Sequence, residues 1–166
     1  MRKVGIIGAS GFTGHELVKI LKKHKKVKLV VINSKTYAGK KIKSLYKTYK
    51  GKETYDNFSV DELNLMNLDC LFLCVPHKEA LKIVPKLKAK KIIDLSADYR
   101  FKNIKTYESV YKTKFPKKSN KAIYGLPELN KSKIKSAKLI ANPGCYPTAS
   151  LLATLPIDKL AKYIVI

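Results

Sequence analysis

The hydrophobic positions of the chain form short continuous runs, and between them lie segments in which apolar residues recur every three to four positions. Short continuous runs are typical of strands buried in a parallel sheet, and the longer period is typical of helices that cover such a sheet. Strands are predicted at 4–7, 27–32, 68–76 and 139–141 and from residue 91 onward, with helices at 13–23, 60–68, 131–136 and 146–155 and one starting at His77. Strands that alternate with helices predict an α/β fold.

Three segments lack a clear period. Residues 37–58 are polar and aromatic, and we expect an irregular excursion with one short helix. Residues 107–121 are basic, and we expect them to be irregular. Residues 162–166 are predicted to form a strand whose apolar end, 163–166, is exposed or paired with another copy, because unpaired edges invite partners. A chain that ends on such a strand is expected to be the N-terminal part of a longer protein.

A glycine-rich turn separates the first predicted strand from the first predicted helix. Gly8, Gly11 and Gly14 have the spacing G-x-x-G-x-x-G. Glycines at such a turn leave room for a pyrophosphate to approach the backbone at a helix N-terminus. The alternative is an ordinary tight turn, but the place of the motif after the first strand favours nucleotide binding. The pattern predicts a Rossmann-like, doubly wound parallel sheet.

The end of the second predicted strand bears on the choice of cofactor. NAD sites usually carry an Asp or Glu about twenty residues after the glycines, where it binds the ribose. This chain has Asn33, Ser34, Lys35 and Thr36 at that place. An acidic side chain would repel a 2′-phosphate, whereas Ser, Lys and Thr would bind it, so we predict NADP. The alternative is a polar loop in a chain that is rich in lysine.

Cys145 lies directly before the helix predicted at 146–155. Pro147 fits the first turn of that helix, where its missing N–H costs nothing, and Asn142 is predicted to cap it. A helix N-terminus favours the thiolate, which is the nucleophilic form of cysteine. Cys145 is therefore a candidate for covalent catalysis. The alternative is a buried loop cysteine that only packs.

The charge of the chain raises the question of nucleic-acid binding. Lys and Arg number 35 against 12 Asp and Glu, which gives a net charge of +23. Arginine, the residue best suited to bidentate recognition, occurs only at Arg2 and Arg100, and the lysines are scattered through every segment. We therefore expect no nucleic-acid role and assign the lysines to a solvated surface that attracts small polyanions.

The remaining composition points to a folded cytoplasmic protein. Hydrophobic residues make up 45% of the 166 residues, and no apolar run reaches eighteen, so no membrane span is predicted. Three cysteines at uneven spacing suit a reducing compartment. Cys70 and Cys74 are an even number of positions apart on one predicted strand, so they share a face and are expected to pack in the core. We predict no metal site.

Six blocks of the sequence, taken in order, resemble a known family. They are the Gly8-Gly11-Gly14 turn, Ser34-Lys35-Thr36, and residues 73–77, 94–101, 124–129 and 142–148. Together they resemble the N-acetyl-gamma-glutamyl-phosphate reductases, within the wider semialdehyde dehydrogenase family. The resemblance implies NADPH-dependent reduction of that acyl phosphate to N-acetylglutamate semialdehyde and phosphate, through a cysteine thioester, in arginine biosynthesis.

The resemblance also assigns roles to residues. It implies that Cys145 is the catalytic nucleophile and that Arg100 holds the substrate phosphate. The alternative for Arg100 is a surface ion pair with Asp94 or Asp98. The cofactor-binding residues that follow from the resemblance and the glycine turn are Gly8, Ser10, Gly11, Phe12, Thr13, Gly14, Ser34, Lys35 and Thr36.

Members of this family are much longer than 166 residues, and their catalytic histidine lies in a second domain. His15, His24 and His77 do not match it. We therefore expect an NADP-binding domain at 1–155, which includes the cysteine segment, and the start of a largely missing second domain at 156–166. The resemblance implies a homo-oligomer for the full-length protein, and negligible reductase turnover for this chain alone.

Two other functions stay open at this point. A related reductase would act on an aminoadipyl or glutamyl phosphate attached to an acidic carrier protein, which the charge of +23 would suit. A non-enzymatic module that senses NADP would need no thiolate, so the segment around Cys145 argues against it.

Overall fold

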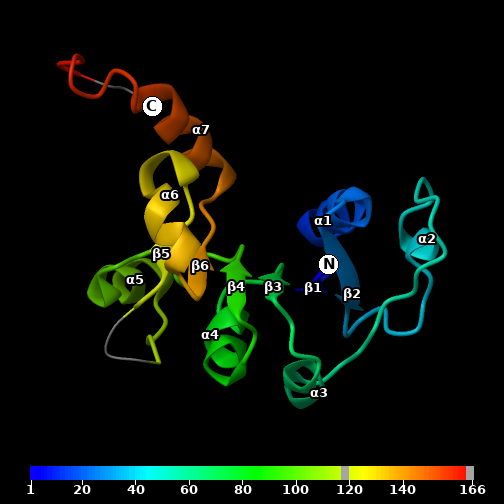
Figure 1. Ribbon diagram of the computed structural model, residues 1–166. Helices are drawn as coiled ribbons and strands as arrows, with labels where there is room; N and C mark the ends of the chain where they lie inside the picture. Colours follow the sequence, from blue (N-terminus) through cyan, green and yellow to red (C-terminus); the bar gives the residue numbers. More distant parts are fainter. Residues whose placement is uncertain (117–119, 164–166) are drawn as a thin grey trace.

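The computed structural model describes residues 1–116 and 120–163 (Figure 1). Its elements are, in chain order, β1 (Arg2–Ile7), α1 (Phe12–Lys23), β2 (Val27–Asn33), α2 (Ile42–Leu45), α3 (Val60–Leu65), β3 (Cys70–Leu73), α4 (Glu79–Ile83), the 3-10 helix η1 (Val84–Lys86), β4 (Lys91–Asp94), α5 (Ile104–Tyr111), β5 (Ile123–Tyr124), α6 (Pro127–Ser136), β6 (Leu139–Ala141) and α7 (Cys145–Thr154).

The strands form one parallel sheet in the order β2-β1-β3-β4-β6-β5. The chain runs from β1 outward to β2 and then crosses over to β3 on the other side of β1. The strand order therefore reverses between β1 and β3, and ligands of such sheets bind outside the carboxyl ends of the strands at this point. The predicted doubly wound, Rossmann-like sheet is confirmed.

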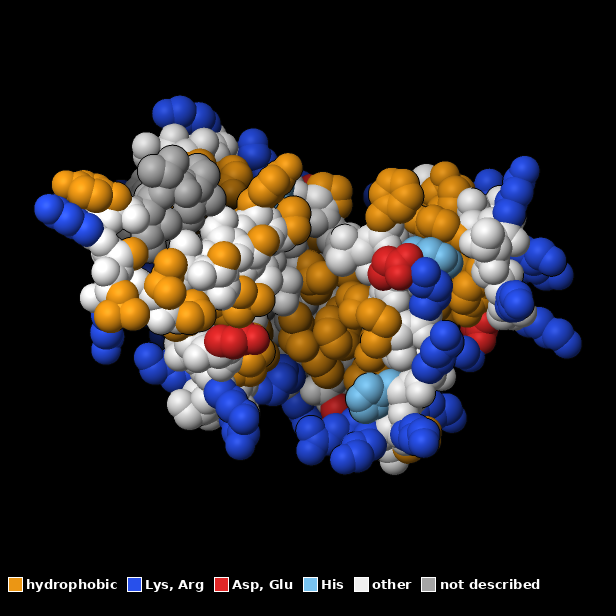
Figure 2. All heavy atoms as spheres, turned by 90° about the horizontal axis from the view of Figure 1, so that it is seen from above, with side chains coloured by type: hydrophobic (Ala, Val, Ile, Leu, Met, Phe, Trp, Pro, Cys, Tyr) orange, Lys and Arg blue, Asp and Glu red, His pale blue; other side chains and the backbone are white. Residues whose placement is uncertain are grey.

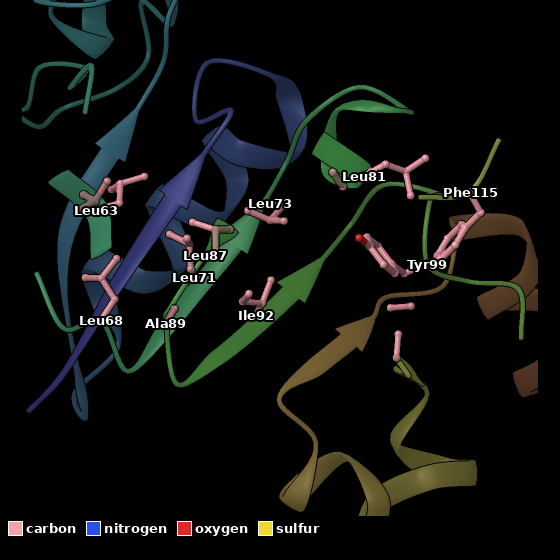
Figure 3. Packing of buried hydrophobic residues seen from close by; sticks show 14 of the residues in the cluster. Leu63, Leu68, Leu71, Leu73, Leu81, Leu87, Ala89, Ile92, Tyr99 and Phe115 are labelled. Carbon is pink, nitrogen blue, oxygen red and sulfur yellow. The ribbon is translucent and has the colours of Figure 1, made fainter. Parts of the chain in front are cut away.

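Helices cover the sheet from both sides (Figure 1). Val18 and Leu21 of α1 pack with Val4 and Ile6 of β1 on one face. On the opposite face, leucines from α3, α4 and β3 pack around Ile92, and Tyr99 and Phe115 extend this cluster (Figure 3). Burial on both faces explains why the strand segments read as continuous apolar runs.

The two faces are covered unequally over the central strands. Leu71, Leu73 and Ile92 are at most 2% exposed, whereas Phe72 and Ile93 on the α1 face are only half-buried. In the space-filling view, hydrophobic side chains gather near the middle of the face, and lysine and arginine side chains lie mainly around them (Figure 2). The basic residues on this face do not form a single stripe.

One segment differs from the prediction. The first third of the stretch expected to be irregular, 107–121, belongs to α5, which starts at Ile104. The Oδ1 atom of Asn103 accepts a hydrogen bond from Thr106 N at 3.3 Å and caps this helix. Tyr107 is buried and donates to the carboxylate of Asp98 at 3.1 Å. The buried ring of Tyr107 and its bond to Asp98 therefore anchor this helix to the loop after β4.

Other boundaries shift by a few residues. α6 begins at Pro127 rather than near residue 131, and α4 begins at Glu79, so His77 lies in the turn before it. The short helix expected within 37–58 is α2. The predicted terminal strand falls mostly outside the described residues, and Lys162 and Tyr163 are not part of a strand.

α7, like α6, is not anchored by buried residues. It follows β6 and lies away from the centre of the sheet (Figure 1). None of its residues is buried, although most of them are apolar. In the segment that follows α7, Ile157 and Leu160 are also exposed.

Candidate active site

Five loops meet at the carboxyl edge of the sheet. They follow β1, β2, β3, β4 and β6, which all run in the same direction. The residues singled out in the sequence fall on four of these loops: the glycine turn after β1, residues 34–36 after β2, Arg100 after β4 and Cys145 after β6. The parallel sheet thus places segments that are far apart in the sequence along a single edge.

The three glycines of the first turn serve different purposes. Gly8 has φ +81°, and a Cβ at this position would overlap the carbonyl of Cys74. A Cβ at Gly14 would overlap the carbonyl of Gly8, so this residue lets α1 pack closely on the turn. At Gly11 the nearest atom to such a Cβ lies 3.6 Å away, and φ is −73°. The fold therefore requires Gly8 and Gly14 but leaves Gly11 free to face a ligand.

A cleft of about 590 Å³ opens beside this turn. Its lining includes six of the nine predicted cofactor residues, namely Gly8, Ser10, Gly11, Ser34, Lys35 and Thr36. The other three, Phe12, Thr13 and Gly14, line an adjoining pocket of about 130 Å³ that also contains Cys74, Val75 and Leu95. The structure therefore brings all nine residues to two hollows that share Gly11.

The polar end of the cleft is held by hydrogen bonds. Ser34 Oγ donates to Ser10 Oγ at 2.8 Å, which joins the loops after β1 and β2. The hydroxyl of Tyr46 donates to the carbonyl of Ser10 at 2.9 Å, and its ring stacks on His15 with centroids 3.6 Å apart. Tyr46, which directly follows α2, thus supports the glycine turn, a role that no local motif indicates.

Asn33 occupies the place where NAD sites carry an acid, but its side chain faces another partner. Its Oδ1 accepts from Phe58 N at 2.7 Å and its Nδ2 donates to the carbonyl of Phe58 at 3.0 Å. The acid in the cleft lining is Glu79, which is paired with Lys82 at 2.5 Å. Lys35 is exposed at the cleft, so the local charge there suits a phosphate.

Cys145 is the first residue of α7, which begins one residue earlier than predicted, and it is exposed. The helix is capped by the backbone of Gly144 rather than by Asn142, so the predicted cap is wrong. Asn142 lies two residues before this cap, where its N–H donates to the carbonyl of Asp94 at 2.8 Å and its Nδ2 donates to the carbonyl of Pro143 at 3.0 Å. The carbonyl of Gly144 instead accepts from both N and Oγ1 of Thr148.

The other two cysteines have a different setting. Cys70 and Cys74 are partly buried and pack with the cluster on the α1 face, as their even spacing along the predicted strand indicates. Burial raises the pKa of Cys70 to about 11 and that of Cys74 to about 12. Both thiols are therefore protonated near neutral pH, which leaves Cys145 as the accessible candidate nucleophile.

Arg100 joins the loops after β4 and β6. Its Nε donates to the carbonyl of Asn142 at 2.8 Å, and its Nη2 donates to the carbonyl of Leu95 at 2.9 Å. Within the described residues, no ion pair links it to Asp94 or Asp98, so the surface-pair alternative is not supported. The third guanidinium nitrogen, Nη1, lies beside Gly144.

Two carboxylates stiffen the loop that carries Arg100. Asp94 is fully buried and accepts from both N and Oγ of Ser96, and its burial raises its pKa to about 6. Asp98 accepts from Lys78 N at 2.8 Å, which ties this loop to the turn before α4. In the same turn, Nδ1 of His77 accepts from Ala97 N at 3.0 Å. The sequence alone did not indicate these contacts.

The fold and the cleft together define a dinucleotide-binding α/β domain. Residues 3–137 match the family described as semialdehyde dehydrogenase, NAD binding domain. The chain therefore belongs to the semialdehyde dehydrogenase family. No helix within residues 1–116 and 120–163 has the length and apolar character needed to cross a membrane.

Curated relatives share more than the fold. The chain is 47% identical over 161 residues to the N-acetyl-gamma-glutamyl-phosphate reductase of Campylobacter jejuni. This match covers 95% of this chain and 46% of that protein. It is 45% identical over 160 residues to the reductase of the same name from Archaeoglobus fulgidus, covering 95% and 48%. The chain is thus a homologue of these reductases, and it spans about half of their length.

A solved structure confirms the fold at lower identity. Aspartate semialdehyde dehydrogenase from Candida albicans, determined with NADP, is 19% identical to this chain and matches it with a TM-score of 0.64. The match covers 96% of this chain and 47% of that protein.

Proposed function

We propose that this chain is the cofactor- and cysteine-bearing part of an NADP-dependent reductase that converts N-acetyl-gamma-glutamyl phosphate to N-acetylglutamate semialdehyde and phosphate. The observation that carries the proposal is the placement of an exposed cysteine at the first position of α7, on the same sheet edge as the dinucleotide cleft. The names of the 41–47% identical relatives support the choice of substrate.

The residues of the cleft fit a dinucleotide phosphate. Gly11 leaves the N-terminus of α1 open, where backbone N–H groups favour a pyrophosphate. Ser34, Lys35 and Thr36 would hold the 2′-phosphate that distinguishes NADP. The side chain of Asn33 would not take part, because its amide group is hydrogen-bonded to the backbone of Phe58. NADP should therefore bind more tightly than NAD. Titrating each against the 166-residue chain by calorimetry tests this, and equal affinity or a preference for NAD would refute it.

The chemistry assigned to this chain is nucleophilic. The Cys145 thiolate attacks the acyl carbon, a C–S bond forms, the bond from that carbon to the phosphate oxygen breaks, and inorganic phosphate leaves. When bound, NADPH would supply the hydride that reduces the thioester. Breaking the C–S bond then releases the aldehyde and returns the thiolate. The N-terminus of α7 favours the anionic sulfur at the start and end of this cycle.

Arg100 is proposed to bind the substrate phosphate. Two of its nitrogens are committed to backbone carbonyls, so the contact falls to Nη1, the nitrogen beside Gly144. A fixed guanidinium at a helix N-terminus is well suited to an anion. The proposed site therefore lies beside Gly144, the residue directly before Cys145.

The rest of the active site is proposed to lie outside this chain. We assign residues 1–155 to the cofactor domain and 156–166 to the start of a second domain, which would supply the acid–base group and hold the acyl chain. Misplaced reactants cost several powers of ten in rate, and loss of a general acid–base group costs about 10²–10⁴-fold more. Residues 1–166 alone are therefore expected to bind NADP with negligible turnover.

The direct test is phosphate-dependent reduction of NADP with N-acetylglutamate semialdehyde. It compares residues 1–166 with a chain that has the length of the relatives. Turnover is expected only from the longer chain, and comparable turnover from both would show that residues 1–166 hold a complete site. If the longer chain reduces NADP only with a semialdehyde on an acidic carrier protein, the alternative favoured by the charge of +23 holds instead.

A further inference from the structure

The Arg100 side chain makes contacts that substrate binding alone does not require. It is partly buried and spans from the loop after β4 to the loop after β6, with bonds of 2.9 Å to the carbonyl of Leu95 and 2.8 Å to the carbonyl of Asn142. β4 and β6 are adjacent strands, and a carbonyl at the carboxyl end of each is satisfied by the same guanidinium. Charge-assisted bonds of this kind are stronger than neutral ones.

Gly144 has no conformational reason to be glycine. Its φ of −69° and ψ of 165° are extended values that any residue adopts, and they are typical of a residue that caps a helix. Ser, Asn and Asp are at least as good as Gly at such a position, and Cys145 follows directly. The reason for glycine must therefore be space rather than backbone geometry.

The space beside Gly144 is taken by Arg100. A Cβ at position 144 would lie 3.0 Å from Nη1 and 3.7 Å from Cζ of this side chain, and 3.4 Å from Cδ of Pro147. The first of these distances is closer than ordinary van der Waals contact, and the guanidinium has little freedom to retreat because its other two nitrogens are bonded. A side chain at 144 would therefore require the guanidinium or the cysteine loop to shift.

We propose that Arg100 and Gly144 act together as a positioning pair for Cys145. Arg100 ties the cysteine loop to β4, and the missing side chain of Gly144 lets the guanidinium close against the backbone one residue before the sulfur. Both residues act through Cys145, whose place at the start of α7 they fix. This role does not depend on the proposed substrate, because it is set by contacts within the chain.

The proposal predicts that serine is a worse N-cap than glycine for α7, which reverses the usual preference. Gly144→Ser should improve an ordinary N-cap, yet here it should lower the melting temperature of the 166-residue chain by several degrees. In the Arg100→Ala background the space is free, so adding Gly144→Ser should be neutral or stabilising. Ser59→Gly at the N-cap of α3, where Ser59 Oγ accepts from Glu62 N, is the matched control and should show the ordinary loss.

Labelling of Cys145 supplies a readout that a purely structural role would not move. Iodoacetate is an anion and iodoacetamide is neutral, so the ratio of their rates reports the positive charge beside the sulfur. Arg100→Ala should lower this ratio by about fivefold, the effect of one charge a few ångströms away in water. Gly144→Ser should lower it in the same direction, because it displaces Nη1, and should add nothing once Arg100 is removed.

Neither experiment uses NADP or substrate, so both test the pairing of Arg100 with Gly144 independently of the proposed reductase function. If Gly144→Ser raises the melting temperature and leaves the labelling ratio unchanged, the pairing is refuted. If Gly144→Ser prevents folding, recovery of the fold by adding Arg100→Ala supports the pairing, and failure to recover it counts against the proposal.

Discussion

Two strand-to-helix turns in this domain end on a capping glycine with nearly the same φ and ψ, but their surroundings are very different. The turn from β1 to α1 is capped by Gly11 at φ −73° and ψ 164°, and the turn from β6 to α7 is capped by Gly144 at φ −69° and ψ 165°. Neither cap uses a side chain. Both helix N-termini lie at the carboxyl edge of the sheet, so both favour negative charge.

The difference lies in what fills the space beside each cap. At Gly11 it is open and borders the cleft, whereas at Gly144 it is closed by Arg100. α1 is anchored by four buried residues, but α7 has none. The first turn therefore offers its backbone to a ligand, and the second offers a side chain, Cys145. The same local geometry serves binding in one place and covalent chemistry in the other.

Removing the thiol should produce the largest effect. In a chain of the length of the relatives, Cys145→Ala is expected to lower reductase turnover by roughly 10⁴-fold or more, since catalysis without its nucleophile falls back on residual binding effects. NADP affinity should not change, because Cys145 does not line the cleft. Steady-state rates and calorimetry check both parts. Cys70→Ala is the control and should keep its turnover; a similar loss from it would undo the assignment.

Thiol reactivity separates the exposed turn from the sheet. At pH 8 a thiol of pKa about 11 is only about 10⁻³ thiolate, so Cys70 should react slowly with iodoacetamide, and Cys74 more slowly still. Cys145 is exposed and should be alkylated first. Timed labelling followed by peptide mass spectrometry gives the order. Faster labelling of Cys70 or Cys74 would contradict the placement of the nucleophile.

Gly11→Ala tests the open cap. A Cβ there meets only the carbonyl of Gly8 at 3.6 Å, an ordinary contact, so the melting temperature should change little. The methyl group would nevertheless occupy the path by which a pyrophosphate approaches the backbone, and NADP affinity should fall about tenfold or more. A large fall in melting temperature with unchanged NADP affinity would mean that Gly11, like Gly144, is needed for packing and not for binding the cofactor.

The smallest expected effect concerns pH and the packing of α1. Burial, followed by the charge of Lys19, lowers the pKa of His15, so the unfolded chain takes up a proton before the folded one. This contribution to stability is present above the unfolded pKa of about 6.5 and is lost as the pH falls below it. Thermal melting from pH 8 to 5 should show a loss that His15→Gln reduces and His24→Gln does not. An identical pH profile for all three chains would contradict it.

Local sequence signals were enough for the first strand, turn and helix and for the start of α7. The apolar run before Gly8 and the glycine spacing place β1, the turn and α1 within two residues of their observed bounds. Cys145 and Pro147 likewise locate the start of α7. These features are short-range, since each depends on residues that are neighbours in the chain.

Most of the differences from the prediction have long-range causes. Asn142 is held beside β4 by the bond from its N–H to the carbonyl of Asp94. β5 has only two residues, and its pairing with β6 determines it. The alternative ion pair of Arg100 failed because two backbone carbonyls hold the guanidinium. None of these contacts leaves a pattern in the local sequence.

The most direct test of the account is to trap the acyl group on the enzyme. A chain of the length of the relatives would be mixed with N-acetyl-gamma-glutamyl phosphate without NADPH, quenched in acid and digested for mass spectrometry. We predict an N-acetylglutamyl group on the peptide that carries Cys145, its disappearance when NADPH is added before the quench, and no adduct in Cys145→Ala. An acyl adduct on another residue would contradict the role of this cysteine as the nucleophile. Turnover by the Cys145→Ala variant, with no adduct formed, would contradict it as well.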